Sequence, residues 1–439
     1  TSPYAQVDWD SYGQYNADFH AHSTNSDGGV LMKDTVEDHY SKGYDILAMT
    51  DHSYLTTRWS QANNGLTEER EAELEAGIDR DGRGMIDIYN SDEQSVVDHI
   101  NSFFATFNNQ AGATMASTIQ SVEDLGGITH INHPGRYTGG KKGGEEGIAA
   151  SNNPTNIKKY VDLFNAYPSC VGMEIVNKID NESRSDRILW DNILKETMPE
   201  GRFVWGFSND DTHSLNATGY SFNMMLMPEL SREETRTSME NGAFYAVSRV
   251  SRMDGINATL PNGKTMPGSG NTDTLYLLDQ STPTISNIQV DDAENAITIS
   301  GQDYNKIEWI ADGEVIATGE TLDLNDYEDD IHSYVRAQLK SDTFAVAEKA
   351  PEKISITSIK TKNGQADINF EIKNANGKGY VLFLSETGEE DSFHTYANVN
   401  YNAKGTHVKG LDKNKTYYAY VAYVDNNAIT QMSPIVTLK

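Results

Sequence analysis

The first half of the chain alternates short apolar runs with segments of helical periodicity. Apolar runs occupy residues 44–50, 126–131, 171–176 and 202–207, and residues 185–198 repeat apolar positions at the spacing of one helix face. This alternation is typical of βα units, which build a barrel or a doubly wound sheet, and we expect a barrel. Residues 229–243 predict its last helix, because Ser231 and Glu234 have capping-box spacing and Gly242 suits a helix end.

Beyond about residue 275 the pattern changes to short alternating stretches separated by Asp, Asn and Gly, which is typical of antiparallel sandwiches. The last segment, with its Tyr-rich late strand at 416–426, is similar to a fibronectin type III module. Pro, Gly and Ser cluster at 258–274, which predicts a linker, and a second boundary is expected at 347–353. We therefore expect an α/β domain over 1–275 and two small all-β sandwich domains over 276–350 and 351–439.

Composition narrows the class of protein. The chain has 439 residues, a formal net charge of −30, one cysteine, and 37% hydrophobic residues. The acidic balance disfavours an extended nucleic-acid surface, and the apolar runs are too short for a transmembrane segment. A single cysteine, Cys170, excludes an internal disulfide and a thiolate metal cluster, and we interpret it as a core residue. Acidic, thiol-poor composition favours an extracellular or cell-surface location and leaves a cytoplasmic one open.

The histidines suggest where the chemistry lies. His20 and His22 alternate on a predicted strand, so both imidazoles face one side, as ligands of one metal ion would. Other apolar runs also end in His or Asp, giving Asp51 with His52, then His133, then Asp211 with His213. Side chains at the carboxyl ends of successive parallel strands converge on one mouth, where barrel enzymes hold their active sites.

These motifs resemble those of the polymerase and histidinol phosphatase (PHP) domain family of metal-dependent phosphoesterases. The sequences "HAHS", "TDH", "HPGR" and "DTH" match the four family motifs in the expected order and cover roughly residues 12–250. The resemblance implies a distorted (β/α)7 TIM-like barrel that carries two to three divalent metal ions.

The resemblance also implies a ligand set. His20, His22 and Asp211 would hold the first ion, and a glutamate would bridge it to the second; we assign that bridge to Glu93. His99 and His133 would complete the second site, and Asp27, His52 and His213 would hold the third. An acidic insertion precedes Glu93, so Glu69, Glu71 and Glu73 are alternatives to it, although such charge runs usually form a solvated helix face.

Charge supports a phosphoester substrate. Three divalent ions against the carboxylates of Asp27, Glu93 and Asp211 leave roughly +3, which attracts a phosphate dianion. We hypothesise hydrolysis of a small phosphomonoester or nucleotide by a metal-bridging hydroxide. Arg136 either binds a phosphate oxygen or is a surface residue. Imidazole and carboxylate ligands suit manganese, iron or zinc without selecting among them.

Several neighbouring residues receive supporting interpretations. Glu174 and Asn177 end a strand and either support the ligands or are ordinary polar termini. His130 faces away from His133 and is expected to be a structural, hydrogen-bonded histidine, whereas His39 is expected on the surface of an outer helix. The Gly- and Lys-rich segment 138–147 reads as a loop, either merely mobile or able to close over substrate.

Two alternatives to the phosphoesterase remain open. The protein could be a surface-attached binding protein with structural metals, whose β modules contact glycan or another protein. It could also hydrolyse a C–N bond, because metal-assisted hydrolysis on a barrel serves amidohydrolases as well, but the carbamylated lysine bridge expected there is absent from the motifs.

Overall fold

A computed structural model of the chain describes residues 2–180, 182–249, 278, 281–341, 353–373, 379–389, 392–399, 404–425 and 428–439. Described residues up to 341 form one compact unit, and those from 353 onward form a second. The predicted linker at 258–274, the boundary positions 275 and 350, and most of 347–353 lie outside the described residues. No helix in the described ranges has the length and apolar character needed to cross a membrane.

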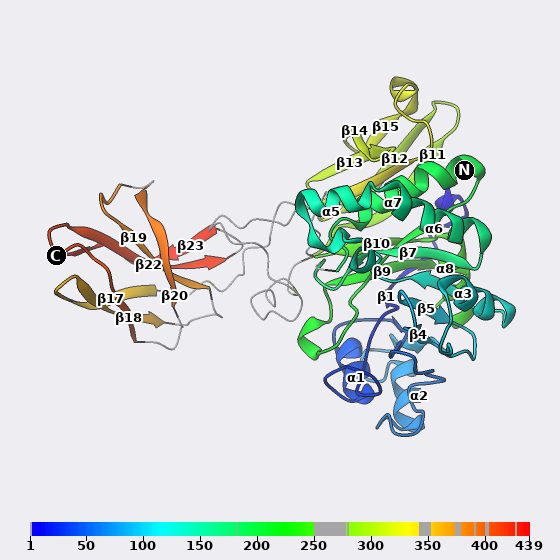
Figure 1. The fold of residues 1–439 in the computed structure, drawn as a ribbon, viewed down its shortest axis with the longest axis horizontal. Coiled ribbons are helices and arrows are strands. Elements are labelled where there is room, and N and C mark those ends of the chain that lie inside the picture. The colour runs from blue at the N-terminus through cyan, green and yellow to red at the C-terminus, as the bar shows by residue number, and fades with distance from the viewer. Residues whose placement is uncertain are drawn as a thin grey trace. The chain divides into compact units, whose positions relative to one another are not determined.

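The α/β part of the first unit contains two five-stranded sheets and covering helices (Figure 1). The first sheet has the order β10-β9-β1-β2-β3 and the second the order β4-β5-β6-β7-β8. The strands are β1 (Gly13–Asp18), β2 (Ile46–Leu47), β3 (Ile86–Asp87), β4 (Asp92–Gln94), β5 (Ile100–Phe103), β6 (Ile128–Ile131), β7 (Cys170–Asn177), β8 (Trp205–Asn209), β9 (Ser221–Met227) and β10 (Phe244–Ser248). The helices are α1 (Met32–Ser41), α2 (Glu68–Ala76), α3 (Met115–Asp124), α4 (Gly135–Thr138), α5 (Gly144–Ser151), α6 (Pro154–Ala166), α7 (Asp186–Thr197) and α8 (Arg232–Asn241).

Each sheet combines parallel and antiparallel pairs. β1, β2 and β3 run parallel, as do β6, β7 and β8, whereas β9, β10, β4 and β5 pair in antiparallel fashion. Isolated bridges join segments that adjoin the two sheets: His52 with Glu93 and Ala21 with Thr212 are parallel, and Thr56 with Ser91 is antiparallel. The predicted mixed α/β class is confirmed, and the closed (β/α)7 barrel stays a prediction.

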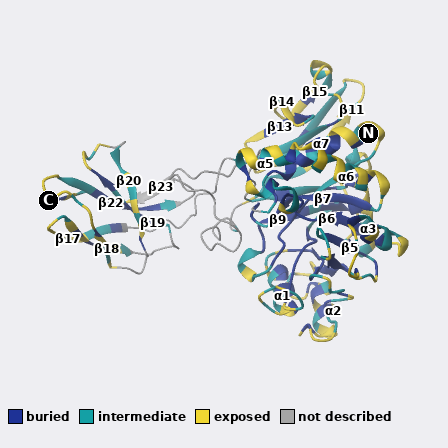
Figure 2. Cartoon of the chain, in the orientation of Figure 1, coloured by how far each residue is buried: buried dark blue, intermediate teal, exposed yellow. Residues whose placement is uncertain are grey.

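A shared apolar core lies between the two sheets. Phe19 packs edge-on against Phe103 at 5.9 Å and Phe207 at 6.1 Å between ring centroids, so residues of both sheets meet in one cluster. Figure 2 shows the strands of this part largely buried and the outer faces of the helices exposed. Cys170 is fully buried in a second cluster beneath α6 and α7, as predicted. Apolar side chains pack closely around the strands that end in the predicted polar residues. This close packing holds those strand ends rigidly in place.

Local sequence signals explain where helix α8 begins and ends. The Ser231 side chain accepts a hydrogen bond from the Glu234 amide at the start, and Gly242 ends the helix at a φ of 71°. This prediction is confirmed. By contrast, segment 138–147, predicted as a loop, is occupied by the end of α4, the 3-10 turn Gly140–Lys142 and the start of α5.

The remaining strands of the first unit form two three-stranded sheets, β11-β12-β15 and β14-β13-β16. Their strands are β11 (Thr284–Asp291), β12 (Ala296–Gln302), β13 (Lys306–Ala311), β14 (Glu314–Thr318), β15 (Thr321–Asp323) and β16 (Val335–Lys340). Trp309 lies at the centre of their core. Arg336 of β16 forms a two-pronged ion pair with Asp191 of α7, at 2.7 and 2.8 Å, so these sheets dock directly on the α/β part.

The second unit also consists of β-sheets, ordered β17-β18-β21 and β20-β19-β22-β23, with β24 paired to β22. The strands are β17 (Lys353–Lys362), β18 (Gln365–Lys373), β19 (Tyr380–Ser385), β20 (His394–Val399), β21 (Gly405–Val408), β22 (Tyr417–Asp425), β23 (Ala428–Met432) and β24 (Val436–Leu438). Residues of both sheets, including Ile368, Leu382 and Val421, share one core. The predicted succession of an α/β part and small all-β sheets is confirmed, and the fibronectin type III assignment stays a prediction.

Candidate metal centre

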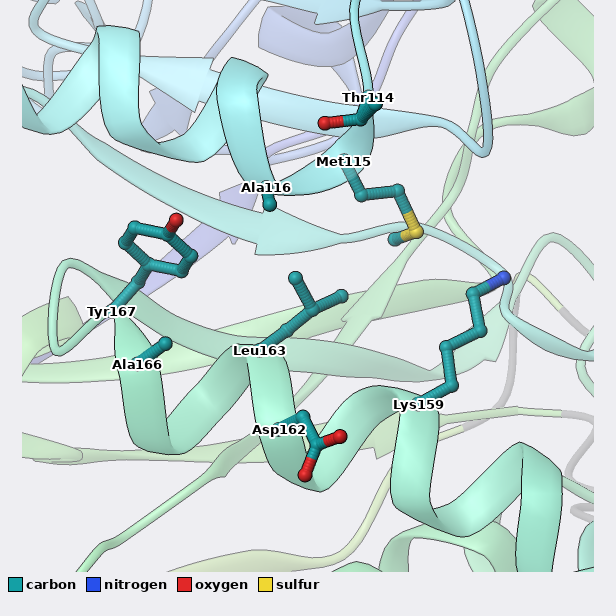
Figure 3. A pocket seen from close by; sticks show the side chains of 8 residues that line it. All are labelled: Thr114, Met115, Ala116, Lys159, Asp162, Leu163, Ala166 and Tyr167. Atoms are coloured by element: carbon teal, nitrogen blue, oxygen red, sulfur yellow. The ribbon is translucent and has the colours of Figure 1, made fainter.

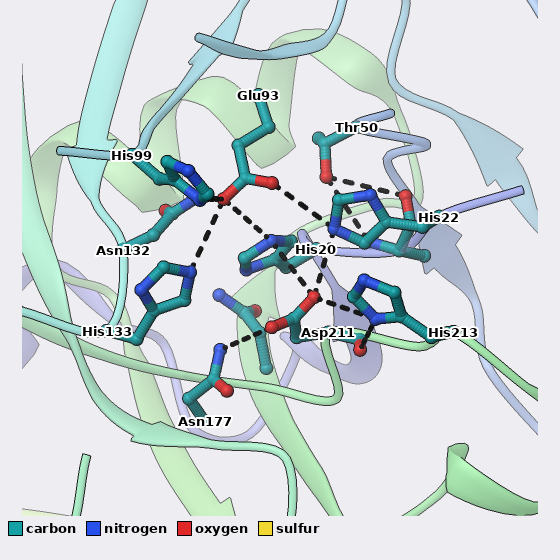
Figure 4. A network of polar contacts seen from close by, with 12 residues as sticks. His20, His22, Thr50, Glu93, His99, Asn132, His133, Asn177, Asp211 and His213 are labelled. Atoms are coloured by element: carbon teal, nitrogen blue, oxygen red, sulfur yellow. Dashed lines mark hydrogen bonds and ion pairs between the residues drawn. The ribbon is translucent and has the colours of Figure 1, made fainter. Parts of the chain in front are cut away.

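All nine predicted ligands lie in one cluster at the ends of the central strands. Figure 4 labels seven of them, all but Asp27 and His52. His20 and His22 follow β1, His52 follows β2, His133 follows β6, and Asp211 and His213 follow β8. Glu93 lies within β4, His99 precedes β5, and Asp27 lies in the turn after β1. The parallel strands β1, β2, β6 and β8 therefore deliver ligands from their carboxyl ends, as the strand-end pattern predicted.

The cluster resolves into overlapping groups whose atoms are close enough to share an ion. His20, His22 and Asp211 form one group, as predicted for the first ion. Glu93 belongs to two groups, one with His20 and His133 and one with His52 and His99. His22, Asp27, His52 and His213 form a further group, which contains the trio predicted for the third ion.

Two buried carboxylates lie at the middle of the cluster. Glu93 Oε1 is 3.3 Å from His20 Nε2 and 3.4 Å from His133 Nε2, and its Oε2 is 3.3 Å from His22 Nε2. Asp211 Oδ1 is 3.3 Å from His20 Nε2 and 3.0 Å from His22 Nε2. Figure 4 shows the His20 ring between these two carboxylates, so Glu93 occupies the place expected of a bridging ligand.

The buried ligand atoms have the character of a cation site. Six of them are buried and make no hydrogen bond with any residue that the structure describes: His20 Nε2, His22 Nε2, Glu93 Oε2, His99 Nδ1, His133 Nδ1 and Asp211 Oδ1. Buried polar atoms are nearly always paired, and such a concentration of unpaired donor-capable nitrogens and carboxylate oxygens fits divalent ions. The residues present therefore fit the implied metal group.

Two buried carboxylates and the imidazoles around them determine the electrostatics of the site. Although burial opposes ionisation, neighbouring imidazoles and Lys178 hold the pKa values of Glu93 and Asp211 well below normal. Burial alone would lower the pKa of His20, but Asp211, Glu174 and Glu93 raise it well above its ordinary value. The surrounding cationic groups thus favour ionised carboxylates here, and divalent cations can take over that role.

One side of the cluster is open. The side chains of His52, His213 and Asp27 are 23%, 29% and 55% exposed, whereas those of His20, His22 and Glu93 are fully buried. Solvent therefore reaches the cluster at the outer group. Arg136 is exposed at the first turn of α4, three residues after His133.

Glu174 and Asn177 of β7 support the ligands from behind. Glu174 Oε1 accepts from His20 Nδ1 at 2.6 Å, which leaves His20 Nε2 facing the cluster, and Oε2 accepts from the His133 amide at 2.8 Å. Asn177 Nδ2 donates to Glu174 Oε2 at 2.9 Å and to Asp211 Oδ2 at 3.2 Å. Of the two interpretations left open for this strand end, the structure agrees with support of the ligands.

Two further histidines have different outcomes. His130 is buried, contacts Asn209 at 3.4 Å, and lies outside the cluster; burial lowers its pKa to about 4, so it is a structural residue as expected. His39 was expected on the surface and that prediction is wrong. It is fully buried, and it bridges the Asp18 carboxylate at 2.9 Å and the Thr35 carbonyl at 2.7 Å.

One of the three glutamates expected on a solvated helix face in the acidic insertion is buried instead. Glu69 and Glu73 of α2 are exposed, as a solvated face predicts, but Glu71 is buried. Its carboxylate accepts from the Ser60 amide at 3.0 Å and pairs with Arg58 at 3.3 Å. None of the three belongs to a metal-ligand group among the described residues.

Sequence reasoning missed Lys178, whose Nζ is 3.3 Å from Asp211 Oδ2. Its only signal was its place directly after Asn177 at a strand end.

A separate depression of about 390 Å³ lies between α3 and α6 and is lined by residues such as Met115, Leu163 and Tyr167 (Figure 3). It contains none of the predicted ligands.

Comparisons with known proteins give partial likenesses. No family model matches the chain. Over 58 residues, 13% of this chain, the sequence is 43% identical to the DNA polymerase/3'-5' exonuclease PolX of Bacillus subtilis, and the match spans only 10% of that protein.

Two solved structures are similar at low TM-score. A two-domain protein from Bacteroides vulgatus, described as containing a predicted PHP-like metal-dependent phosphoesterase, is 16% identical, with 90% of this chain and 96% of that one covered and a TM-score of 0.39. An amidohydrolase from Chromobacterium violaceum is 17% identical, with 45% and 88% covered and a TM-score of 0.31. The chemistry of this chain has to be argued from its own site.

Proposed function

We propose that the protein is a metal-dependent phosphoesterase that hydrolyses a small phosphomonoester or nucleotide. The observation that carries the proposal is the convergence of nine imidazole and carboxylate side chains, spread from residue 20 to residue 213, six of which have a buried atom without a hydrogen-bond partner among the described residues. A structural cluster needs no open side, yet the outer group is accessible to solvent. This favours catalysis over a metal cross-link.

The proposed ligand roles follow the groups in the cluster. His20, His22 and Asp211 would hold one ion, with Glu93 shared with a second ion that His99 and His133 complete. Asp27, His52 and His213 would hold a third at the open side. When bound, divalent manganese, iron or zinc would supply Lewis-acid charge and an acidified water for attack on phosphorus.

The chain's own residues would prepare the site for that chemistry. Glu174 keeps a proton on His20 Nδ1 and so directs its Nε2 lone pair inward. Apolar packing under the cluster excludes bulk water from its inner side, which strengthens attraction between the centre and an anionic substrate. Arg136, exposed beside the His133 turn, would bind a phosphate oxygen through its guanidinium.

The residue expected at the bridging position distinguishes a phosphoesterase from an enzyme that hydrolyses C–N bonds. An amidohydrolase-type centre would call for a carbamylated lysine between two ions, whereas Glu93, close to both His20 and His22, would take that position in this chain. Lys178 approaches Asp211 through the oxygen that faces away from the histidines. The geometry therefore favours a carboxylate-bridged centre and a phosphoester substrate.

The test uses the full chain loaded with manganese and a chromogenic phosphate monoester. We expect His20→Ala and Asp211→Ala to lower kcat/KM by more than about 100-fold, because they remove ligands rather than their supports. His407→Ala in β21 is the matched control, since His407 lies outside the cluster. Chelation should lower the melting temperature of the wild type and leave that of His20→Ala nearly unchanged. Metal-loaded protein that stays inactive across a panel of phosphoesters would refute the proposal.

A further inference from the structure

Lys178 places an ammonium group beside the metal centre without joining it. The residue directly follows β7, its side chain is 15% exposed, and Nζ lies 3.3 Å from Asp211 Oδ2. The two carboxylate oxygens of Asp211 therefore face different groups. Oδ1 faces His20 and His22, and Oδ2 faces Asn177 and Lys178. A cation cannot be a metal ligand, so Lys178 needs a different role.

The backbone holds Lys178 in an unfavourable conformation. Its φ is 57°, in the left-handed region that non-glycine residues rarely adopt, and two of the ligands, His133 and Asp211, also have positive φ values of 26° and 45°. The Lys178 amide donates to the Asn209 carbonyl at 3.0 Å, and its carbonyl accepts from the Ser221 hydroxyl. Strained residues persist where neighbours fix them, and they cluster at functional sites.

The ammonium is charged and has capacity to spare. An ammonium has three N–H donors, and Asp211 is the one ion-pair partner of Lys178 among the described residues. A partly exposed ammonium beside an open metal site can donate to an anion that is bound there.

We propose that Lys178 is a substrate-binding residue that donates to a non-bridging oxygen of the phosphoryl group held at the metal centre. Its positive charge favours a dianionic phosphomonoester over a monoanionic phosphodiester. This inference rests on the proposed function, because it assumes that a phosphoryl group occupies the site.

The experiment measures binding of inorganic phosphate to the manganese-loaded full chain by calorimetry, together with metal content and melting temperature. Lys178→Asn removes the charge and tolerates the left-handed conformation, so it should fold and keep its metal content, with a melting temperature lowered only by the loss of the ion pair with Asp211. We expect its Kd for phosphate to rise about tenfold or more, and Lys178→Arg to lose less. Lys158→Asn is the control, because that lysine is 74% exposed on α6.

A kinetic comparison of a phosphomonoester with a phosphodiester tests the substrate class. In Lys178→Asn, kcat/KM for p-nitrophenyl phosphate should fall more than kcat/KM for its methyl diester. Unchanged phosphate affinity, or phosphate binding lost only together with metal, would overturn the inference and leave the phosphoesterase proposal standing. If the metal-loaded wild type neither binds phosphate nor hydrolyses either ester, the proposed function itself fails, and this inference fails with it.

Discussion

Replacing Glu174 with glutamine tests how the chain prepares its metal ligands. The Glu174 carboxylate accepts four hydrogen bonds: from His20 Nδ1 at 2.6 Å and Asn209 Nδ2 at 3.0 Å on one oxygen, and from the His133 amide at 2.8 Å and Asn177 Nδ2 at 2.9 Å on the other. Glutamine has nearly the same volume, but one of its ends is a donor. Whichever way the amide turns, two of these four donors then face an NH2 group.

The expected loss of metal affinity depends on which ring nitrogen of His20 carries the proton. If the amide NH2 faces His20, the imidazole must accept through Nδ1 and carry its proton on Nε2, the atom that would bind metal. Losing such an orienting partner typically lowers metal affinity by about 10 to 100-fold, or about 1.4 to 2.8 kcal/mol. Without metal, weakening hydrogen bonds to a buried charge should lower the free energy of unfolding by about 3 kcal/mol.

The assay is a manganese titration of the full-length wild type and Glu174→Gln, in competition with a chelator of known affinity. Glu69→Gln is the control, because Glu69 is exposed on α2 and lies outside the cluster. We expect the affinity of Glu174→Gln alone to fall. An affinity within twofold of the wild type would show that Glu174 does not set the His20 tautomer.

Two further predictions concern stability in the β11–β16 part of the first unit. Asp191→Ala should lower the free energy of unfolding by about 3 kcal/mol, because it leaves the largely buried Arg336 guanidinium without its partner; Asp191→Ala and Arg336→Ala should be far from additive in urea unfolding, and additive effects would contradict a direct pair. Lys306 and Lys340 more than offset the effect of burial and lower the pKa of Glu308 to about 2, below its unfolded value of about 4.5. The stabilisation from the ionised Glu308 is therefore full above pH 4.5 and is lost as the pH falls through 2. The urea midpoints of wild type and Glu308→Gln should converge between pH 4.5 and pH 2, and a constant difference would argue against this pKa.

Features encoded by neighbouring residues were the ones that the sequence could predict. The alternation of His20 and His22 fixes a shared face, and placement of His133 and Asp211 directly after apolar runs fixes their strand ends. Parallel strands then bring these ends together whatever the intervening loops do, so the ligand positions could be anticipated without the details of closure. Closure into a single seven-stranded barrel stays a prediction, because pairing of the two sheets depends on contacts between distant strands.

Buried charges were harder to foresee. His39 reads as a surface residue on a polar helix because its partner, Asp18, precedes that helix by a full strand-to-helix connection. Lys178 carries no motif, since its position beside the cluster depends on Asp211, 33 residues later. The ion pair between Asp191 and Arg336 joins residues 145 positions apart. A charged side chain is buried only where a partner exists, and the local pattern contains no information on that partner.

The two parallel bridges between the five-stranded sheets fall at the metal cluster itself. One bridge pairs His52 with Glu93, which both belong to the proposed ligand set, and the other pairs Ala21 with Thr212, whose neighbours His20, His22, Asp211 and His213 belong to it. Ions held there would join side chains that follow strands of both sheets. Loss of the ions would then weaken the contact between the two sheets first at this end of the strands.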